Sequence, residues 1–167
     1  MRFFKRVATG AEAGLLAGAG VAVFFLIEDA VQLQPLSTPM ALASGLMGVG
    51  TPEVDGGTIS RLAAFGFLGV KLLAYTVFHF LAFAAVGVVG AFVLKVTSFW
   101  STLLSGAAFG SVACTGLLYG SQLVVDLPVA LDVLGVPSVF LVNAMGGAIL
   151  GLGLHLAHTV KEDHEPS

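Results

Sequence analysis

The chain has 167 residues, of which 57% are hydrophobic and 10% are charged, and its formal net charge is −3. A soluble domain carries about 25% charged residues because its surface faces water, so this composition excludes an ordinary soluble protein and indicates one surrounded by lipid. The weak negative charge offers no basic surface for nucleic acid, and the single cysteine excludes an intrachain disulfide or a multi-cysteine metal site.

Four apolar stretches are long enough to cross a bilayer, whose core needs about twenty helical residues. The first stretch exceeds the apolar part of a cleaved signal peptide, so we expect it to remain as a membrane anchor. The predicted fold is all-α: a polytopic, four-helix antiparallel bundle in one domain over residues 1–160, followed by a tail over 161–167. The expected spans are about 7–31, 66–95, 99–125 and 137–160.

The connections between these spans differ in length. After the first span, Thr38-Pro39 predicts a short helix over about 39–48 on the outer side, with Thr38 as the cap and Pro39 in the first turn. Little more than Lys95 to Ser98 joins the second and third spans. We therefore expect these two helices to form an antiparallel hairpin.

The distribution of basic residues predicts the orientation, since Lys and Arg are enriched on the cytoplasmic side of membrane proteins. With the N-terminus inside, five of the seven basic residues lie on the inner face and two on the outer face. The expected location is therefore a bacterial inner membrane, crossed several times, with both termini cytoplasmic. The inner residues are Arg2, Lys5, Arg6, Lys95 and Lys161, and the outer ones are Arg61 and Lys71.

Small residues recur at a spacing of four along three of the spans. Lipid gives no gain for burying large apolar side chains, so membrane helices pack through small residues that let their backbones approach. We expect such packing at Gly14, Gly18, Gly110, Gly147 and Gly151. We expect the bundle to pack against itself through these small residues. The alternative is that one row of small residues packs against a partner chain.

Five polar side chains from the four spans fall in the outer half of the predicted bundle. Tyr75 and His79 share one helix face, and Asn143 lies at nearly the depth of His79. Asp29 lies on the small-residue face of the first span, and Gln122 is near the outer end of the third. Polar groups inside a membrane are costly and suggest a functional site, but hydrogen-bonded contacts between helices explain the same residues.

The histidines give little support for a metal or haem. His79 and His155 differ in depth by about 15 Å at 1.5 Å per residue, too far apart to ligate one haem iron from opposite sides. His155, His158 and His164 are weak candidates for a metal at the inner rim, because their spacing matches no firm zinc pattern. No cofactor is expected.

Three short motifs support a family resemblance: Phe25-Leu26-Ile27-Glu28-Asp29, Pro35-Leu36-Ser37-Thr38-Pro39 and Ala74-Tyr75-Thr76-Val77-Phe78-His79-Phe80. With them the first half of the chain resembles a group of small uncharacterised bacterial four-helix integral membrane proteins. These have an Asp-ended first helix, a Pro-Leu-x-Thr-Pro segment and a Tyr-Thr-x-x-His second helix. The resemblance implies no activity, but Asp29, Tyr75 and His79 fall inside its pattern.

The leading functional expectation is a non-enzymatic integral membrane protein, in contact with the lipid bilayer and packed against itself or within a larger membrane complex. Two alternatives stay open. One is a transporter or channel-like oligomer that uses the outer polar residues. The other is a membrane redox or quinone-linked subunit that uses His79 and Tyr75.

Overall fold

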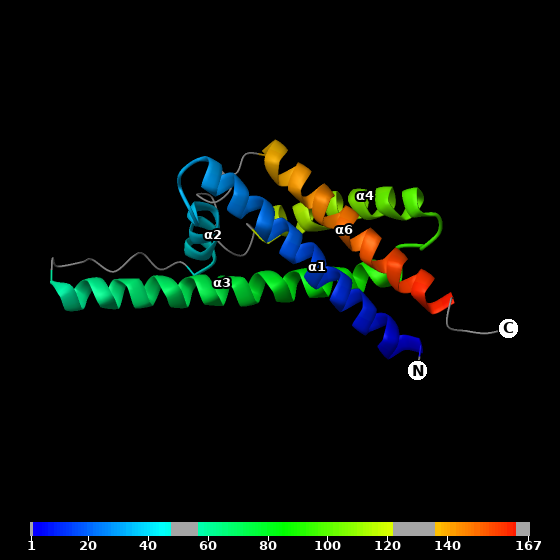
Figure 1. Ribbon diagram of the computed structural model, residues 1–167, viewed down its shortest axis with the longest axis horizontal. Coiled ribbons are helices and arrows are strands. Elements are labelled where there is room, and N and C mark those ends of the chain that lie inside the picture. The colour runs from blue at the N-terminus through cyan, green and yellow to red at the C-terminus, as the bar shows by residue number, and fades with distance from the viewer. Residues whose placement is uncertain (1, 48–56, 122–135, 163–167) are drawn as a thin grey trace.

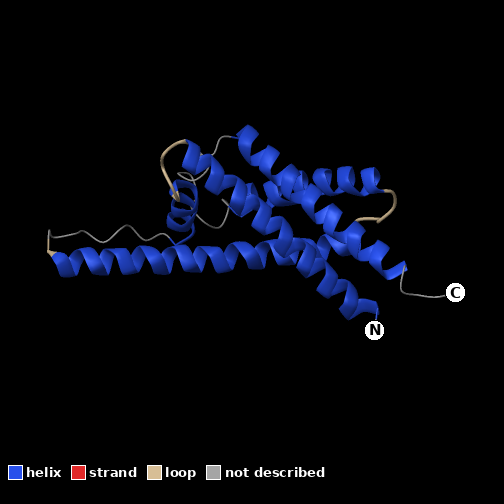
Figure 2. Ribbon diagram, viewed as in Figure 1, coloured by secondary structure: helices blue, strands red, loops and turns tan. Residues whose placement is uncertain are grey.

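The computed structural model describes residues 2–47, 57–121 and 136–162, and the regular structure in these ranges is entirely helical. Helix α2 is short, whereas the other four helices are long (Figure 1, Figure 2). The helices are α1 (Arg2–Val31), α2 (Ser37–Met47), α3 (Thr58–Val93), α4 (Phe99–Ser121) and α6 (Val136–Glu162).

The four long helices confirm the predicted all-α polytopic bundle. Each contains a stretch long and apolar enough to cross a membrane: Phe3–Val31, Ser60–Val93, Phe99–Gly120 and Pro137–Val160. Helices α1 and α3 begin earlier than the apolar runs alone predict, because helical structure continues into their polar flanks. The short helix begins at Ser37, two residues before the predicted start.

The helices are arranged in space as α3, α1, α6 and α4, with the start of α1 and the end of α6 at the same end of the bundle (Figure 1). Helix α1 packs against α3 and α6, and α4 packs against α6. The predicted hairpin of the second and third spans is wrong, because α3 and α4 scarcely touch although only five residues join them. Leu94 is extended (φ −75°, ψ 133°), so the chain leaves α3 away from its axis and α4 reaches α6 instead.

Glycines determine which helices pair. An added Cβ on Gly87 of α3 would lie 2.6 Å from the Gly14 Cα of α1, and one on Gly110 of α4 would lie 2.5 Å from the Gly147 Cα of α6. In both pairs the backbones touch, as expected where lipid gives no gain for burying larger side chains. Gly18 and Gly151 also face protein, whereas an added Cβ on Gly116 would meet nothing within 4 Å.

The first half of α3 extends beyond the other long helices (Figure 1). The helix has 36 residues, about 54 Å at 1.5 Å per residue, whereas a bilayer core is about 30 Å thick. Leu62 and Phe65 in this half are 68% and 79% exposed. A strong tilt of α3 would keep these apolar side chains in lipid.

Helix α2 folds back onto α3 and covers Lys71, one of the two basic residues assigned to the outer face. Lys71 is only 1% exposed. Its ammonium Nζ lies 3.4 Å from the hydroxyl of Ser44 in α2 and 5.4 Å from the centre of the Phe67 ring. A buried amine requires such partners, so α2 is part of the packed structure.

Candidate functional site

Asp29, near the end of α1, is only 2% exposed and holds the start of α2. Its carboxylate accepts the backbone N–H of Thr38 at 2.9 Å, the Thr38 hydroxyl at 2.7 Å and the Ser37 hydroxyl at 2.8 Å. The first N–H groups of a helix have no partner within it, and a carboxylate there also interacts favourably with the helix dipole. Asp29 therefore supplies the cap that the sequence assigned to Thr38.

The turn that brings Ser37 and Thr38 to Asp29 contains two left-handed leucines. Leu33 has φ 57° and Leu36 has φ 68°, a conformation that costs a residue with a Cβ about 1–2 kcal/mol. The turn is closed by the N–H of Gln34, which donates to the backbone carbonyl of Asp29 at 2.9 Å. The charged hydrogen bonds of the Asp29 side chain offset this conformational strain.

His79 of α3 faces α1. Its Nε2 lies 3.0 Å from the carbonyl oxygen of Gly18, and since a carbonyl only accepts hydrogen bonds, Nε2 carries the proton. The ring centre lies 4.8 Å from that of Phe83 and 5.8 Å from that of Tyr75. His79 and Tyr75 thus belong to an aromatic contact on α3, with the imidazole joined to the backbone of α1.

Asn143 of α6 is 7% exposed and joins α6 to α4. Its side-chain amide donates to the hydroxyl of Thr115 at 3.0 Å. Thr115 was not among the residues that the sequence singled out, because a lone threonine in an apolar helix carries no distinctive pattern.

Of the five polar residues expected in the outer half, the structure brings Tyr75 and His79 into contact. The side-chain hydrogen bonds of Asp29, His79 and Asn143 go to three different partners: α2, the backbone of α1, and Thr115. Gln122 lies outside the described residues. The described contacts hold helices together, and a ligand site formed by these residues stays a prediction.

The hydrogen bond between Asn143 and Thr115 joins two membrane helices, and its energy can be measured by a double-mutant cycle. We expect Asn143→Ala and Thr115→Val to show a coupling energy of about 0.6 kcal/mol, the average for hydrogen bonds between membrane helices. The measurement is the free energy of unfolding in mixed micelles for the wild type, both single variants and the double variant. Strictly additive effects would contradict a direct bond.

His155 and His158, near the end of α6, were the described candidates for a metal site. In the ranges that the structure describes, no group of three or more His, Cys, Asp or Glu side chains is placed to hold a metal ion. The His155 ring meets the edge of the Phe99 ring, with centres 5.8 Å apart. His158 lines a pocket, and His164 lies outside the described residues.

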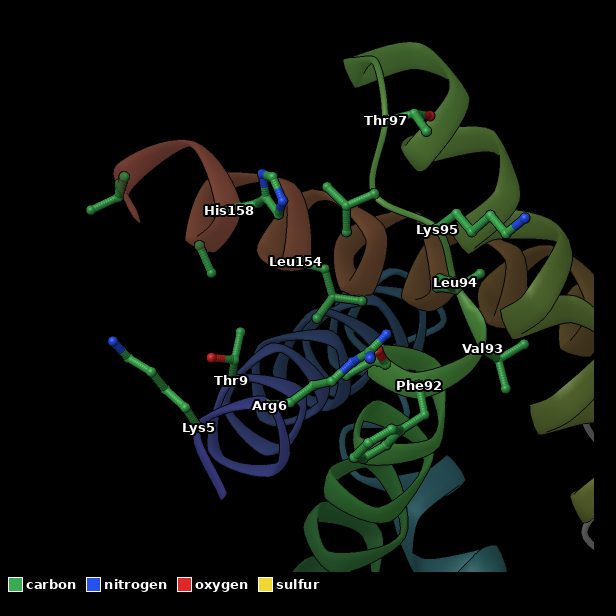
Figure 3. A pocket seen from close by; sticks show the side chains of 14 residues that line it. Lys5, Arg6, Thr9, Phe92, Val93, Leu94, Lys95, Thr97, Leu154 and His158 are labelled. Atoms are coloured by element: carbon green, nitrogen blue, oxygen red, sulfur yellow. The ribbon is translucent and has the colours of Figure 1, made fainter. Parts of the chain in front are cut away.

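The pocket next to His158 measures about 1080 Å³ and lies where α1 begins and α6 ends (Figure 3). We call it the terminal-end pocket. It lies between the start of α1, the end of α3 with the following segment, and the last turns of α6. Its polar lining consists of the cations Lys5, Arg6 and Lys95 together with Thr9, Thr97 and His158, and its apolar lining includes Phe92, Leu94, Leu154 and Ala157.

Arg6 is held in place at this pocket. Its Nε–H donates to the carbonyl oxygen of Ala91 at 2.6 Å, and its guanidinium carbon lies 4.9 Å from the centre of the Phe92 ring. Ala91 is in the last turn of α3, where the carbonyl oxygens accept no hydrogen bond from an N–H of the same helix. Figure 3 shows Arg6 reaching from α1 toward this turn, with Lys5 and Lys95 at opposite edges of the opening.

Sequence reasoning counted these cations for orientation but did not identify the pocket. Its lining comes from residues 5–9, 91–97 and 154–160, which become neighbours only through the pairing of α1 with α3 and α6. Comparison with protein-family models, curated proteins and solved structures gave no match.

Proposed function

We propose that this chain is a non-enzymatic integral membrane protein, a self-packed helical bundle that acts through binding at its surfaces. We place it in a plasma membrane with both termini in the cytoplasm. The cations Lys5, Arg6 and Lys95 at the terminal end support this orientation, since such residues collect on the cytoplasmic side.

The observation that supports a closed bundle is backbone contact at its centre. Gly14 on α1 lies against α3, and Gly110 on α4 lies against Gly147 on α6, too closely for a Cβ. A small cavity between the helices, which we call the central cavity, is lined in part by Ala17, Phe83 and Cys114 and measures about 10 Å³. That is about the space of one water molecule.

This packing disfavours the transporter or channel alternative for a single bundle. An aqueous path between the described helices would require them to separate, and that would break the glycine contacts. Two of the buried polar side chains also bond to the protein itself, Asp29 to Thr38 and Asn143 to Thr115. They act as contacts between elements of the fold.

A flux measurement tests the proposal against the transporter alternative. Liposomes that contain the purified protein and an entrapped pH-sensitive dye are expected to lose a proton gradient no faster than protein-free liposomes. The same comparison with a potassium gradient and a cation-sensitive dye extends the test to ions. A flux faster than in protein-free liposomes would overturn the proposal if His79→Phe abolishes it. The control is Leu81→Phe on the exposed face of α3, which should leave such a flux unchanged.

A further inference from the structure

We infer that the terminal-end pocket binds the phosphate-bearing headgroup of an anionic phospholipid. This inference goes beyond the proposed function and does not depend on it. The pocket lies at one end of the membrane-spanning helices, where the headgroups of one leaflet meet the protein. A basic pocket between membrane helices at this level suits an anionic headgroup.

The charge of the lining favours an anion. Lys5, Arg6 and Lys95 line the pocket, and no acidic side chain is among the described residues that do so. The helix dipoles at this end oppose one another, because α1 and α4 begin here whereas α3 and α6 end here. The side-chain cations therefore dominate the local field.

Arg6 is prearranged for a phosphate. Its Nε–H is used on the carbonyl of Ala91, and the Phe92 ring fixes the guanidinium from one side. The other N–H donors of a guanidinium are on its two terminal nitrogens, the fork that binds phosphate oxygens in pairs. An arginine that these contacts already order loses less entropy when a ligand binds.

The apolar part of the lining favours a lipid over a free phosphate ion. Phe92 and Leu94 at the end of α3 and Leu154 and Ala157 from α6 line the pocket, and this apolar lining suits the glycerol and the first methylenes of acyl chains. The volume of about 1080 Å³ is slightly above the range of small-molecule sites, which measure about 300–1,000 Å³. Inorganic phosphate would leave most of it unfilled.

Lipid titration of the full-length protein, followed by native mass spectrometry in a neutral detergent, tests the inference. Phosphatidylglycerol is expected to bind about tenfold or more tightly than phosphatidylcholine. Lys5→Gln and Lys95→Gln should each weaken phosphatidylglycerol binding about fivefold, because one cation near the headgroups contributes about 1 kcal/mol. Both lysines are exposed, so the fold should persist. Arg61→Gln, on the protruding half of α3, is the control.

A steric variant distinguishes the pocket from a diffuse basic surface. Ala157→Phe narrows the pocket without changing the charge and should weaken phosphatidylglycerol binding several-fold, whereas Leu156→Phe, next to it but not in the lining, should leave that binding unchanged. Equal binding of the two lipids, or unchanged binding by Ala157→Phe, would overturn the inference. Displacement of phosphatidylglycerol by millimolar inorganic phosphate would assign the site to a soluble phosphate and would also overturn it.

Discussion

Gly14→Ala is expected to destabilise the bundle by about 2 kcal/mol, although it adds a single methyl group. The new Cβ would lie 2.9 Å from the carbonyl carbon of Phe83 and 3.0 Å from the Cα of Ala84, both backbone atoms of α3. Backbone cannot rotate away as a side chain can, so α1 and α3 must separate. The measurement is thermal unfolding in detergent, followed by a thiol-reactive dye on Cys114, which lines the central cavity.

Two other glycines provide the controls. At Gly18 the added Cβ would lie 3.0 Å from the Cβ and 3.1 Å from the Cγ of Phe83, which is less tight than the contacts with the α3 backbone at Gly14, so Gly18→Ala should destabilise less. At Gly116 nothing lies within 4 Å, and Gly116→Ala should stabilise by up to about 1 kcal/mol through helix propensity. Equal melting midpoints for all three variants would contradict glycine-mediated packing.

The same glycines explain how far the fold could be predicted. Four apolar runs of bilayer length identified the spans, because hydrophobic length is a local property of the chain. Which helices pair is not local. The short connection after Lys95 suggested an α3–α4 hairpin, but contact between Gly110 and Gly147 places α4 on α6. Pairing followed the surfaces where backbones could meet.

The candidate site shows the same limit. The helical wheel correctly placed Asp29 on a protein-facing surface, since it is 2% exposed. It could not predict the hydrogen-bond partner of Asp29. Thr38 reaches the carboxylate only because the chain turns back through the left-handed residues Leu33 and Leu36. Neither residue is a glycine, so no sequence signal marks the turn.

Asp29→Ala is expected to release α2 from the bundle. The substitution removes the acceptor of three hydrogen bonds and leaves the buried N–H of Thr38 without a partner. Hydrogen bonds to a charged group contribute about 1.5–3 kcal/mol each, and these three share one carboxylate. We expect a loss of about 3 kcal/mol, concentrated on the attachment of α2, because the strained turn at Leu36 then lacks its compensation.

Labelling of a cysteine in α2 measures this release. Ala43 is 0% exposed, so in a chain with Cys114→Ala the variant Ala43→Cys should react slowly with a water-soluble maleimide. Adding Asp29→Ala should raise the labelling rate about a hundredfold, the factor that corresponds to about 3 kcal/mol. Cysteine is larger than alanine and can itself loosen the packing at position 43. The labelling rate of the chain with Cys114→Ala and Ala43→Cys alone is therefore the reference.

Glu28→Ala is the matched control. It removes the same charge one residue earlier on α1, but the Glu28 carboxylate has no hydrogen bond to Ser37 or Thr38, and its buried Oε2 lacks a partner among the described residues. Labelling at position 43 should therefore stay slow. Asp29→Asn should give an intermediate rate, since a neutral amide oxygen still accepts the Thr38 N–H but without charge assistance. Fast labelling in Glu28→Ala as well would mean that net charge near the end of α1, rather than the capping geometry of Asp29, holds α2 in place.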